Sequence, residues 1–365
     1  MDERLKNAFL ELLRSGIWGT HPNATYFSDF SDEDWCTVHT IACKQAVIAV
    51  CLQAVCRLPE SCRPPSSLLL KWIGQGKYIE VQNRKIAEIW IELNEKFSAE
   101  GIYPVILKGL SFANNYANPL SRQAGDLDLL IPSQFEKTVT LVKRWGYQVQ
   151  STLQHDSFYY KEIAIELHPR INSFEYNYRL PCHVTIATFD SVTIRIPDVN
   201  TECILLLLHA AKHLMNIGIG YRLLCDWAVF LKRNYQRLDV QLLSDEIKRI
   251  GIQHFVAEFT DLAFRELNLS IAELEFWRKG SNLKYSRQLA EELWSWGDFE
   301  NIRKKATALN SFWDKIDFYI FCKFRRRYYW PRAFWKILPN LFGSIILFRI
   351  KRCIDIFLTT TPHRT

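Results

Sequence analysis

The sequence predicts an α+β protein in which a mixed central region lies between helical N-terminal and C-terminal regions. Segments 103–107 and 126–131 show the apolar run and the polar–apolar alternation that are typical of strands. The first hundred residues and those from 201 onward instead carry apolar residues at helical spacing. We therefore expect three regions, with the boundaries 1–84, 85–200 and 201–365.

The composition is typical of a folded protein in a reducing compartment. The chain has 365 residues, of which 48% are hydrophobic and 23% are charged, and this excludes a disordered or collagen-like protein. Its ten cysteines contain no C-x-x-C pair, which excludes the zinc-ribbon, thioredoxin and haem-attachment motifs. The first residues lack the pattern of a signal peptide, and no uncharged apolar run reaches the roughly 18 residues that cross a bilayer. We expect a cytoplasmic protein.

Two helices are predicted in the first hundred residues. Ser31 stands three residues before Asp34, as a helix N-cap does, and an apolar-rich helix is expected over 35–58. A second helix is expected over 77–100, and Gly101 ends it. Its apolar stripe consists of Ile79, Ile86, Trp90, Leu93 and Phe97.

Helices and strands alternate in the central region, and helices alone follow residue 200. We expect a helix over 109–116 between the first two strands and a helix over 133–145 after them. Further strands are expected over 147–153, 157–161, 163–167 and 192–196. The C-terminal helices are expected over 201–214, 221–234, 239–250, 253–266, 283–296 and 310–358, the last interrupted near Pro331 and Pro339.

The strongest chemical signal is a glycine before a short helix, followed by two acids on a strand. Asp126 and Asp128 stand at i and i+2, so their carboxylates project from one face about 6 to 7 Å apart. Carboxylates at this spacing suit Mg²⁺, which completes its shell with phosphate oxygens and water. Gly109 lets the backbone approach phosphates at the start of the helix, and Lys108 and Arg122 add positive charge for them.

A site for phosphoryl or nucleotidyl transfer requires a third carboxylate on a neighbouring strand, where it activates or orients the attacking hydroxyl. Glu166 meets this requirement, because it is an acid within the apolar strand pattern of residues 163–168. A partly buried carboxylate needs a metal or a cation as its partner. The alternative is that Glu166 faces solvent on an edge strand. His168 follows Glu166 by two residues and points to the same side, either near the metal or as a support for the carboxylate.

These motifs resemble a known family. The segments V-I-L-K-G-L-S-F-A, S-R-Q-A-G-D-L-D-L-L-I, I-A-I-E-L-H and L-L-H-A-A-K-H are similar to those of the uncharacterised bacterial nucleotidyltransferase family, within the polymerase-beta-like nucleotidyltransferase superfamily. The resemblance implies a mixed β-sheet that carries the acids and a divalent cation, Mg²⁺ or Mn²⁺. It also implies the transfer of a nucleoside monophosphate from a nucleoside triphosphate such as ATP to an unknown hydroxyl acceptor.

The resemblance also assigns roles to single residues. It makes Asp126, Asp128 and Glu166 the catalytic acids and metal ligands. Gly109 and Ser111 would line the triphosphate, although Leu110 stands between them where the superfamily usually has Gly followed directly by Gly or Ser.

A pair of histidines on a later helix has several interpretations. His209 and His213 stand at i and i+4 and therefore share a helix face. They are expected to be core histidines, a pair that faces the nucleotide pocket, or ligands of a zinc ion. On the next helix, Arg222 and Asp226 stand at i and i+4, and we expect an ion pair, either within the helix or between domains.

The last residues of the chain are basic and aromatic. Residues 319–365 hold ten Lys or Arg and one acid, so this tail carries a charge of +9 and the remainder of the chain carries −2. Three interpretations of residues 319–358 stay open: a helix packed on the domain, contact with an anionic membrane surface, and contact with single-stranded nucleic acid.

Two other functions compete with nucleotidyl transfer. The first is a non-catalytic nucleotide-binding or interaction protein that retains the fold. The second is a D-x-D glycosyltransferase, in which Lys108, Gly109 and Glu166 would have no evident role.

Overall fold

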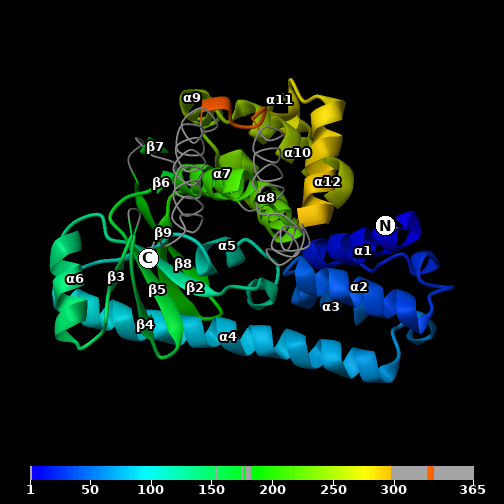
Figure 1. The fold of residues 1–365 in the computed structure, drawn as a ribbon, viewed down its shortest axis with the longest axis horizontal. Coiled ribbons are helices and arrows are strands. Elements are labelled where there is room, and N and C mark those ends of the chain that lie inside the picture. The colour runs from blue at the N-terminus through cyan, green and yellow to red at the C-terminus, as the bar shows by residue number, and fades with distance from the viewer. Residues whose placement is uncertain are drawn as a thin grey trace, which may run out of the picture.

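The computed structural model describes residues 2–152, 155–173, 176–177, 182–216, 218–296 and 327–332. A β-sheet and a group of C-terminal helices lie above one long helix, α4 (Ser66–Ala99), which also passes under the N-terminal helices (Figure 1). The predicted fold class, α+β with a mixed sheet and helical flanks, is confirmed.

The N-terminal region consists of helices α1 (Glu3–Trp18), α2 (Asp32–Lys44) and α3 (Ile48–Val55). The predicted N-cap is confirmed: the Ser31 side chain accepts from the backbone N–H of Asp34, and the Asp34 side chain accepts from the backbone N–H of Ser31. The single helix expected over 35–58 is wrong. Two helices occupy this range, and Ala46 between them has a left-handed φ of +54° that interrupts the helical backbone.

The long helix α4 connects the N-terminal region to the sheet. It begins directly after Pro65, eleven residues before the expected helix, because proline fixes a backbone angle that suits a helix start. Near its beginning, Trp72 is buried and donates from Nε1 to the carbonyl of Ile48 on α3. Farther along, all members of the predicted apolar stripe are buried. The predicted boundary at residue 84 falls inside this helix.

The central sheet has five strands in the order β1-β2-β5-β4-β3. Strands β2 and β5 are parallel and their neighbours are antiparallel, so the sheet is mixed. The strands are β1 (Val105–Ile106), β2 (Asp126–Leu130), β3 (Gln150–Ser151), β4 (Asp156–Tyr160) and β5 (Ile163–His168). Helices α5 (Leu110–Ala113) and α6 (Phe135–Arg144) lie at the predicted positions.

Two hairpins complete the β structure, and only one of their strands was expected. They are formed by β6 (Asn172–Ser173) with β7 (Tyr176–Asn177), and by β8 (Val184–Phe189) with β9 (Val192–Pro197). Short 3₁₀ helices cover Ala24–Tyr26, Glu60–Cys62, Pro119–Ser121, Tyr235–Arg237 and Ala272–Leu274.

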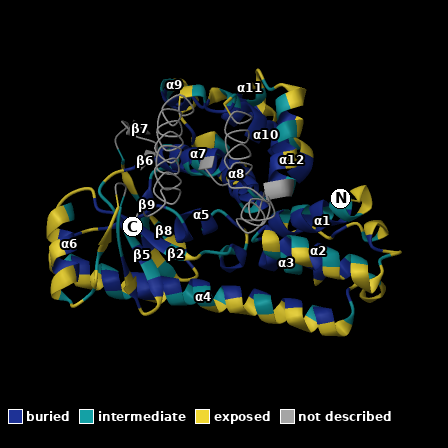
Figure 2. Ribbon diagram, viewed as in Figure 1, coloured by how far each residue is buried: buried dark blue, intermediate teal, exposed yellow. Residues whose placement is uncertain are grey.

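The strand alternation gives the sheet one apolar face and one polar face. Leu127, Leu129, Ile165 and Leu167 are almost fully buried in a core that includes Trp90 of α4. The alternate residues of the same strands, which include all the predicted acids, therefore lie on the opposite face. Figure 2 shows that α4 is exposed along its outer side, whereas α8 is buried over most of its length.

Five of the C-terminal helices agree with the prediction to within a few residues, the short helix Glu275–Arg278 was not expected, and the helix predicted over 310–358 lies outside the described residues except for 327–332. The C-terminal helices that the structure describes are α7 (Val199–Asn216), α8 (Tyr221–Asn234), α9 (Val240–Ile250), α10 (Gln253–Leu267), α11 (Glu275–Arg278) and α12 (Leu283–Trp296). Of the helices that the structure describes, none combines the length and the apolar character that crossing a membrane requires.

The basic aromatic tail, 319–358, lies outside the described residues except for 327–332. In that short segment Tyr329 and Trp330 are fully buried. Trp330 donates from Nε1 to the carbonyl of Ile250, and Tyr328 stacks on Tyr285 with ring centroids 3.5 Å apart. These rings pack on the C-terminal helices, as the first of the three interpretations expects. Membrane and nucleic-acid contact by the rest of the tail stay predictions.

Candidate active site

Three carboxylates meet on the polar face of the sheet. Asp126 and Asp128 come from β2, and the parallel register places Glu166 of β5 directly beside Asp128. One oxygen atom from each of the three acids lies within 4.8 Å of the others. The structure thus brings together the three acids that the sequence singled out.

Lys108 and His168 both contact one oxygen of the central acid. Asp128 Oδ1 lies 2.6 Å from Lys108 Nζ and 2.8 Å from His168 Nε2. The other oxygen, Oδ2, is buried and has no hydrogen-bond partner among the described residues. A buried carboxylate oxygen without a partner is costly, so this atom is available for a ligand.

The charges around the acids affect their protonation in opposite ways. Burial alone would raise the pKa of Asp128, but the charges and hydrogen bonds of Lys108 and His168 hold that pKa well below its ordinary value. Burial and then the negative charge of Asp128 raise the pKa of Asp126. Burial lowers the pKa values of Lys108 and His168, but contact with Asp128 outweighs this effect and raises both. The site therefore favours a charged Asp128, whereas the charges of Lys108 and Arg222 do not offset the effects of burial and Asp128 on the pKa of Asp126.

The donor set fits a hard divalent cation. Carboxylate oxygens are the ligands that Mg²⁺ and Mn²⁺ prefer, and here three of them converge. The unpartnered Oδ2 of Asp128 gives such an ion a buried ligand atom. A cation beside Asp126 would favour the charged form of this carboxylate, whose pKa is raised.

Gly109 allows the chain to pass close to the acid-bearing strand. Its backbone has φ +55° and ψ −104°, and a Cβ atom there would lie 3.2 Å from the carbonyl oxygen of Asp126. A residue with a side chain is disfavoured here because its φ would be positive and because its Cβ atom would lie too close to this carbonyl oxygen. The glycine therefore brings the start of α5 against β2, as the sequence predicted from its position before the helix.

The hydroxyl of Ser111 is hydrogen-bonded to a protein carboxylate, away from the three acids. Ser111 is fully buried, and its Oγ donates to Glu202 Oε1 at 2.8 Å. Asn115 Nδ2 donates to the same oxygen at 3.3 Å. The inserted Leu110 moves this hydroxyl one position along the helix, and the geometry gives no support to the expected triphosphate contact.

The guanidinium of Arg122, which was expected to bind phosphate, contacts protein groups in the wall of the site. Arg122 is 3% exposed, and its guanidinium binds both carboxylate oxygens of Asp226 at 2.7 Å. It also donates to the carbonyl of Gly109 at 3.3 Å. Arg222 instead donates to the carbonyl of Gln123, so the intrahelical Arg222–Asp226 pair is not formed, whereas Asp226 pairs with Arg122 of the central region. The bidentate contact explains the difference, because Arg122 occupies both oxygens of this carboxylate.

The two histidines of α7 pack edge-to-face beside the site. The rings of His209 and His213 have centroids 4.5 Å apart, and Phe112 lies beside His209. Burial lowers the pKa of both, that of His213 to about 4, so the neutral forms dominate at neutral pH. Within the described residues, neither belongs to a group of three donors that could hold a metal. The zinc interpretation therefore has no third ligand in this part of the chain.

Two further residues lie at the site without having been assigned a role. His155 Nε2 lies 3.6 Å from Glu166 Oε1, and the rings of His155 and His168 have centroids 5.2 Å apart. Lys212 of α7 is affected by the charges of Lys108, Glu166 and Asp128, although burial is the main reason why its pKa is lowered. Lys212 could have been found from its place in the L-L-H-A-A-K-H segment. No sequence pattern marks His155, which precedes β4 in a turn.

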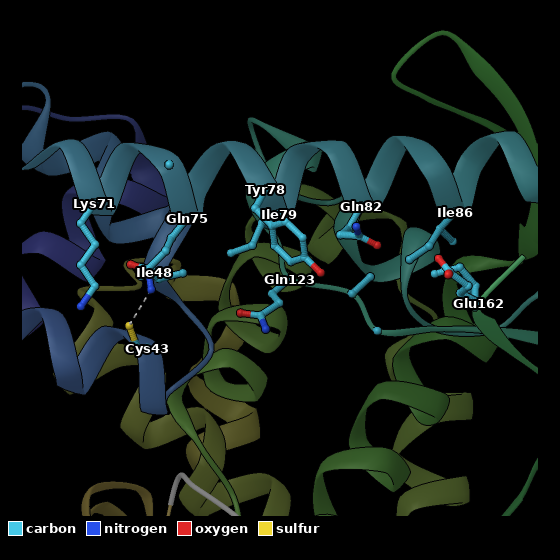
Figure 3. A pocket seen from close by; sticks show the side chains of 14 residues that line it. Cys43, Ile48, Lys71, Gln75, Tyr78, Ile79, Gln82, Ile86, Gln123 and Glu162 are labelled. Atoms are coloured by element: carbon cyan, nitrogen blue, oxygen red, sulfur yellow. Dashed lines mark hydrogen bonds between the residues drawn. The ribbon is translucent and has the colours of Figure 1, made fainter.

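A groove of about 700 Å³ begins where the acid-bearing strands begin. It is lined by Gln123, Ala124 and Gly125, which precede Asp126, and by Ile163, the first residue of β5. Figure 3 shows the side chain of Tyr78 extending from α4 toward Gln123, whereas the side chain of Gln75 points to Cys43. Further lining residues are Cys43, Ile48, Lys71, Gly74, Ile79, Ile86 and Glu162.

Three comparisons with known proteins bear on the family of this chain. No curated protein matches the chain. Among solved structures, an antigenic nucleotidyltransferase-like protein from Paracoccidioides brasiliensis matches at 14% identity and a TM-score of 0.33, over 51% of this chain and 93% of that chain. A model of a family described as "Uncharacterised nucleotidyltransferase" matches residues 31–268, which include all three acids and the groove. The chain therefore belongs to this uncharacterised nucleotidyltransferase family, as its motifs predicted.

Proposed function

We propose that the protein is a metal-dependent nucleotidyltransferase that moves a nucleoside monophosphate from a nucleoside triphosphate to a hydroxyl acceptor. The observation that carries the proposal is the unpartnered, buried Oδ2 of Asp128 within a group of three converging carboxylates. The match of the chain to a nucleotidyltransferase family supports the same function.

Asp126, Asp128 and Glu166 would hold Mg²⁺ or Mn²⁺ in this proposal. When bound, the ion neutralises charge on the phosphates and polarises the α-phosphate. The acceptor oxygen forms a bond to the α-phosphorus, and the bond from that phosphorus to the oxygen bridging to the β-phosphate breaks, so pyrophosphate leaves. Glu166, which is 24% exposed in its side chain, accepts the proton of the acceptor hydroxyl.

Lys108 and Lys212 are the residues that we assign to the triphosphate. Lys108 contacts Asp128 and lies beside Gly109, where the chain passes closest to β2. Lys212 lies on α7, close enough to Asp128 and Glu166 for their charges to affect its pKa. Arg122 is a positioning residue, because it acts on the site through the carbonyl of Gly109.

We place the acceptor in the groove between α4 and the loop before Asp126. Glu162 there forms an ion pair with Lys85, and Lys71 is the remaining charged residue of the lining. The side chains of Gln82 and Gln123 line the groove and make no hydrogen bond within the described residues. This lining matches the hydroxyl groups of an uncharged polar molecule better than it matches a triphosphate.

Incubation with Mg²⁺ or Mn²⁺ and each α-labelled nucleoside triphosphate, with and without extract of the native host, tests the transfer. The wild type is expected to label a protein, an RNA or a small molecule, and Asp128→Asn is expected to lose this label. Asp245→Asn, an exposed acid on α9, is the matched control and should retain it. Nucleotide binding without product would instead favour the non-catalytic alternative, and the absence of both would refute the site.

Gly74→Phe tests the location of the acceptor. Gly74 lines the groove, and a Cβ atom there meets no other atom within 4 Å, so an added ring occupies the groove without a clash in the fold. We expect labelling of the acceptor to fall about tenfold, equivalent to about 1.4 kcal/mol, while binding of a fluorescent nucleoside triphosphate is unchanged. Gly74→Ala is the control that adds only a methyl group. Weaker nucleotide binding by Gly74→Phe would show that the groove holds the nucleobase instead.

A further inference from the structure

Two histidines and Glu166 form a second group of ligand atoms beside the three acids. His155 precedes β4, whereas Glu166 and His168 stand two residues apart on β5. Their ligand atoms all lie within 4.8 Å of one another. Glu166 belongs to both groups, so the two lie side by side with this carboxylate in common.

The separations within this group match those between ligands of one metal ion. His168 Nε2 lies 3.3 Å from Glu166 Oε2, and His155 Nε2 lies 3.6 Å from Glu166 Oε1. In a tetrahedral site with metal–nitrogen bonds of about 2.0 to 2.1 Å, neighbouring ligand atoms are about 3.3 to 3.4 Å apart. These two distances run to different oxygens of Glu166, so side-chain rotations are needed to bring one atom of each residue onto the same ion.

The donor set selects a different metal from the acid triad. Imidazole nitrogens suit zinc and other later divalent transition metals, whereas carboxylate sets suit magnesium and manganese. Two histidines with one glutamate are a ligand set of catalytic zinc sites, in which water or substrate fills the fourth position. The side chains of His155, Glu166 and His168 are 23%, 24% and 12% exposed, so solvent can reach that position.

The backbone fixes both histidines. His168 ends β5 opposite Leu130 of β2, and its carbonyl accepts from the N–H of Ile131 at 2.8 Å. The hydroxyl of Thr152 accepts from the N–H of His155 and donates to its carbonyl. Neither histidine therefore depends on the acids for its location.

We propose that His155, Glu166 and His168 form a transition-metal site, selective for Zn²⁺ or Co²⁺ over Mg²⁺, which shares Glu166 with the acid triad. His168 Nε2 cannot bind a metal and donate to Asp128 at once, so occupancy replaces their hydrogen bond. Metal binding here stands whether or not transfer occurs, and only a role in catalysis would rest on the proposed function.

Co²⁺ titration of the full-length protein, followed by visible absorption and calorimetry, tests the site. The wild type is expected to bind Co²⁺ with the d–d bands of a four- or five-coordinate ion, and Zn²⁺ should displace it while excess Mg²⁺ should not. His155→Ala should weaken Co²⁺ binding at least about tenfold, since even residues outside the ligand shell affect affinity by 10- to 100-fold. His21→Ala, in the N-terminal region, is the matched histidine control and should match the wild type.

A second variant separates this site from the acid triad. Asp126→Asn changes the triad and leaves both histidines intact, so it should retain the Co²⁺ spectrum while it loses Mn²⁺ binding. Three results would overturn the proposal: a wild type without cobalt bands, unchanged affinity in His155→Ala, or displacement of Co²⁺ by Mg²⁺. The readout is binding, so a protein without transferase activity would still give a clear answer.

Discussion

Two clusters of buried charge lie on either side of Gly109 and differ in how completely they are satisfied. In one cluster, Asp226 receives two hydrogen bonds from Arg122 and a third, at 2.8 Å, from the hydroxyl of Tyr116. In the other, Lys108 and His168 contact only Oδ1 of Asp128, and its buried Oδ2 has no partner in the part of the chain that the structure describes. Buried ion pairs with all their hydrogen bonds made are typical of structural networks, whereas unsatisfied acids of perturbed pKa gather at functional sites.

The comparison also corrects a role that residue type alone suggested. Arg122 and Lys108 are both cations next to the acid motif, and both were expected to bind phosphate. The structure buries Arg122 with three hydrogen bonds to protein oxygens, whereas Lys108 keeps 20% of its side chain exposed. A buried cation that is bound to a carboxylate has less to offer a ligand than a partly exposed one.

The largest expected effect is the loss of transfer when an acid of the unsatisfied cluster is replaced. Asp126→Asn should lower transfer at least about a thousandfold, because a bound metal contributes several kcal/mol to the transition state and each 1.36 kcal/mol is a factor of ten. The same change should stabilise the metal-free protein at neutral pH. The raised pKa of Asp126 means that its contribution to stability is present at low pH and is lost as the pH rises through that pKa.

Steady-state transfer assays and urea unfolding, both as a function of pH, check this prediction. Wild type and Asp126→Asn should have similar stability near pH 3 and diverge at higher pH. A large loss of stability in Asp126→Asn at neutral pH would mean that the acid cluster is structural, like the other one.

The next largest effect is expected when the ion pair of Arg122 with Asp226 is broken. Asp226→Asn should lower the free energy of unfolding by about 3 to 5 kcal/mol, because it leaves the buried guanidinium of Arg122 without its counter-charge. The double variant Arg122→Met with Asp226→Leu should recover much of this loss, and chemical denaturation measures both. If Asp226→Asn unfolds like the wild type, the pair does not hold the structure together.

A third buried acid gives an intermediate case, because Glu202 is satisfied by neutral hydrogen bonds and has no cation in contact. Burial raises its pKa to about 7. Its contribution to stability is therefore fully present below its unfolded pKa of about 4.5 and is lost as the pH rises through about 7. Glu202→Gln keeps an oxygen that accepts from Ser111 and Asn115, so it should stabilise the protein by up to about 3 kcal/mol at pH 8. Thermal unfolding at pH 5 and pH 8 measures this, and equal gains at both pH values would contradict it.

The smallest expected effect concerns the glycine that joins the clusters. Gly109→Ala should cost about 1 to 3 kcal/mol of stability, because the residue has a positive φ and the new methyl group would lie 3.2 Å from the carbonyl oxygen of Asp126. Gly101→Ala is a control, since its φ is also positive but a Cβ atom there meets open space. A larger loss at position 109 than at 101, measured by urea unfolding, would show the cost of the contact with β2.

The sequence by itself determined the class of fold and the acids of the site. The i and i+2 spacing of Asp126 and Asp128 places both on one strand face whatever the strand packs against. The C-terminal helices followed from apolar periodicity, and the capping box at Ser31 followed from local spacing. The break at Ala46 did not, because a turn within a continuous apolar run changes no local pattern. The start of α4 after Pro65 was missed although proline is a local signal, because the predicted helix was placed only where the apolar stripe was clear.

Only the tertiary structure decided which polar groups are partners. Arg122 and Asp226 are 104 residues apart in sequence, and no local signal distinguishes their pair from the equally plausible Arg222–Asp226 pair. The parallel pairing of β2 with β5 brings Glu166 beside Asp128, and the turn before β4 adds His155 to the same place. Periodicity depends on neighbours along the chain and can therefore predict the elements. The chemistry of the site depends on contacts between distant segments, which only the folded chain makes.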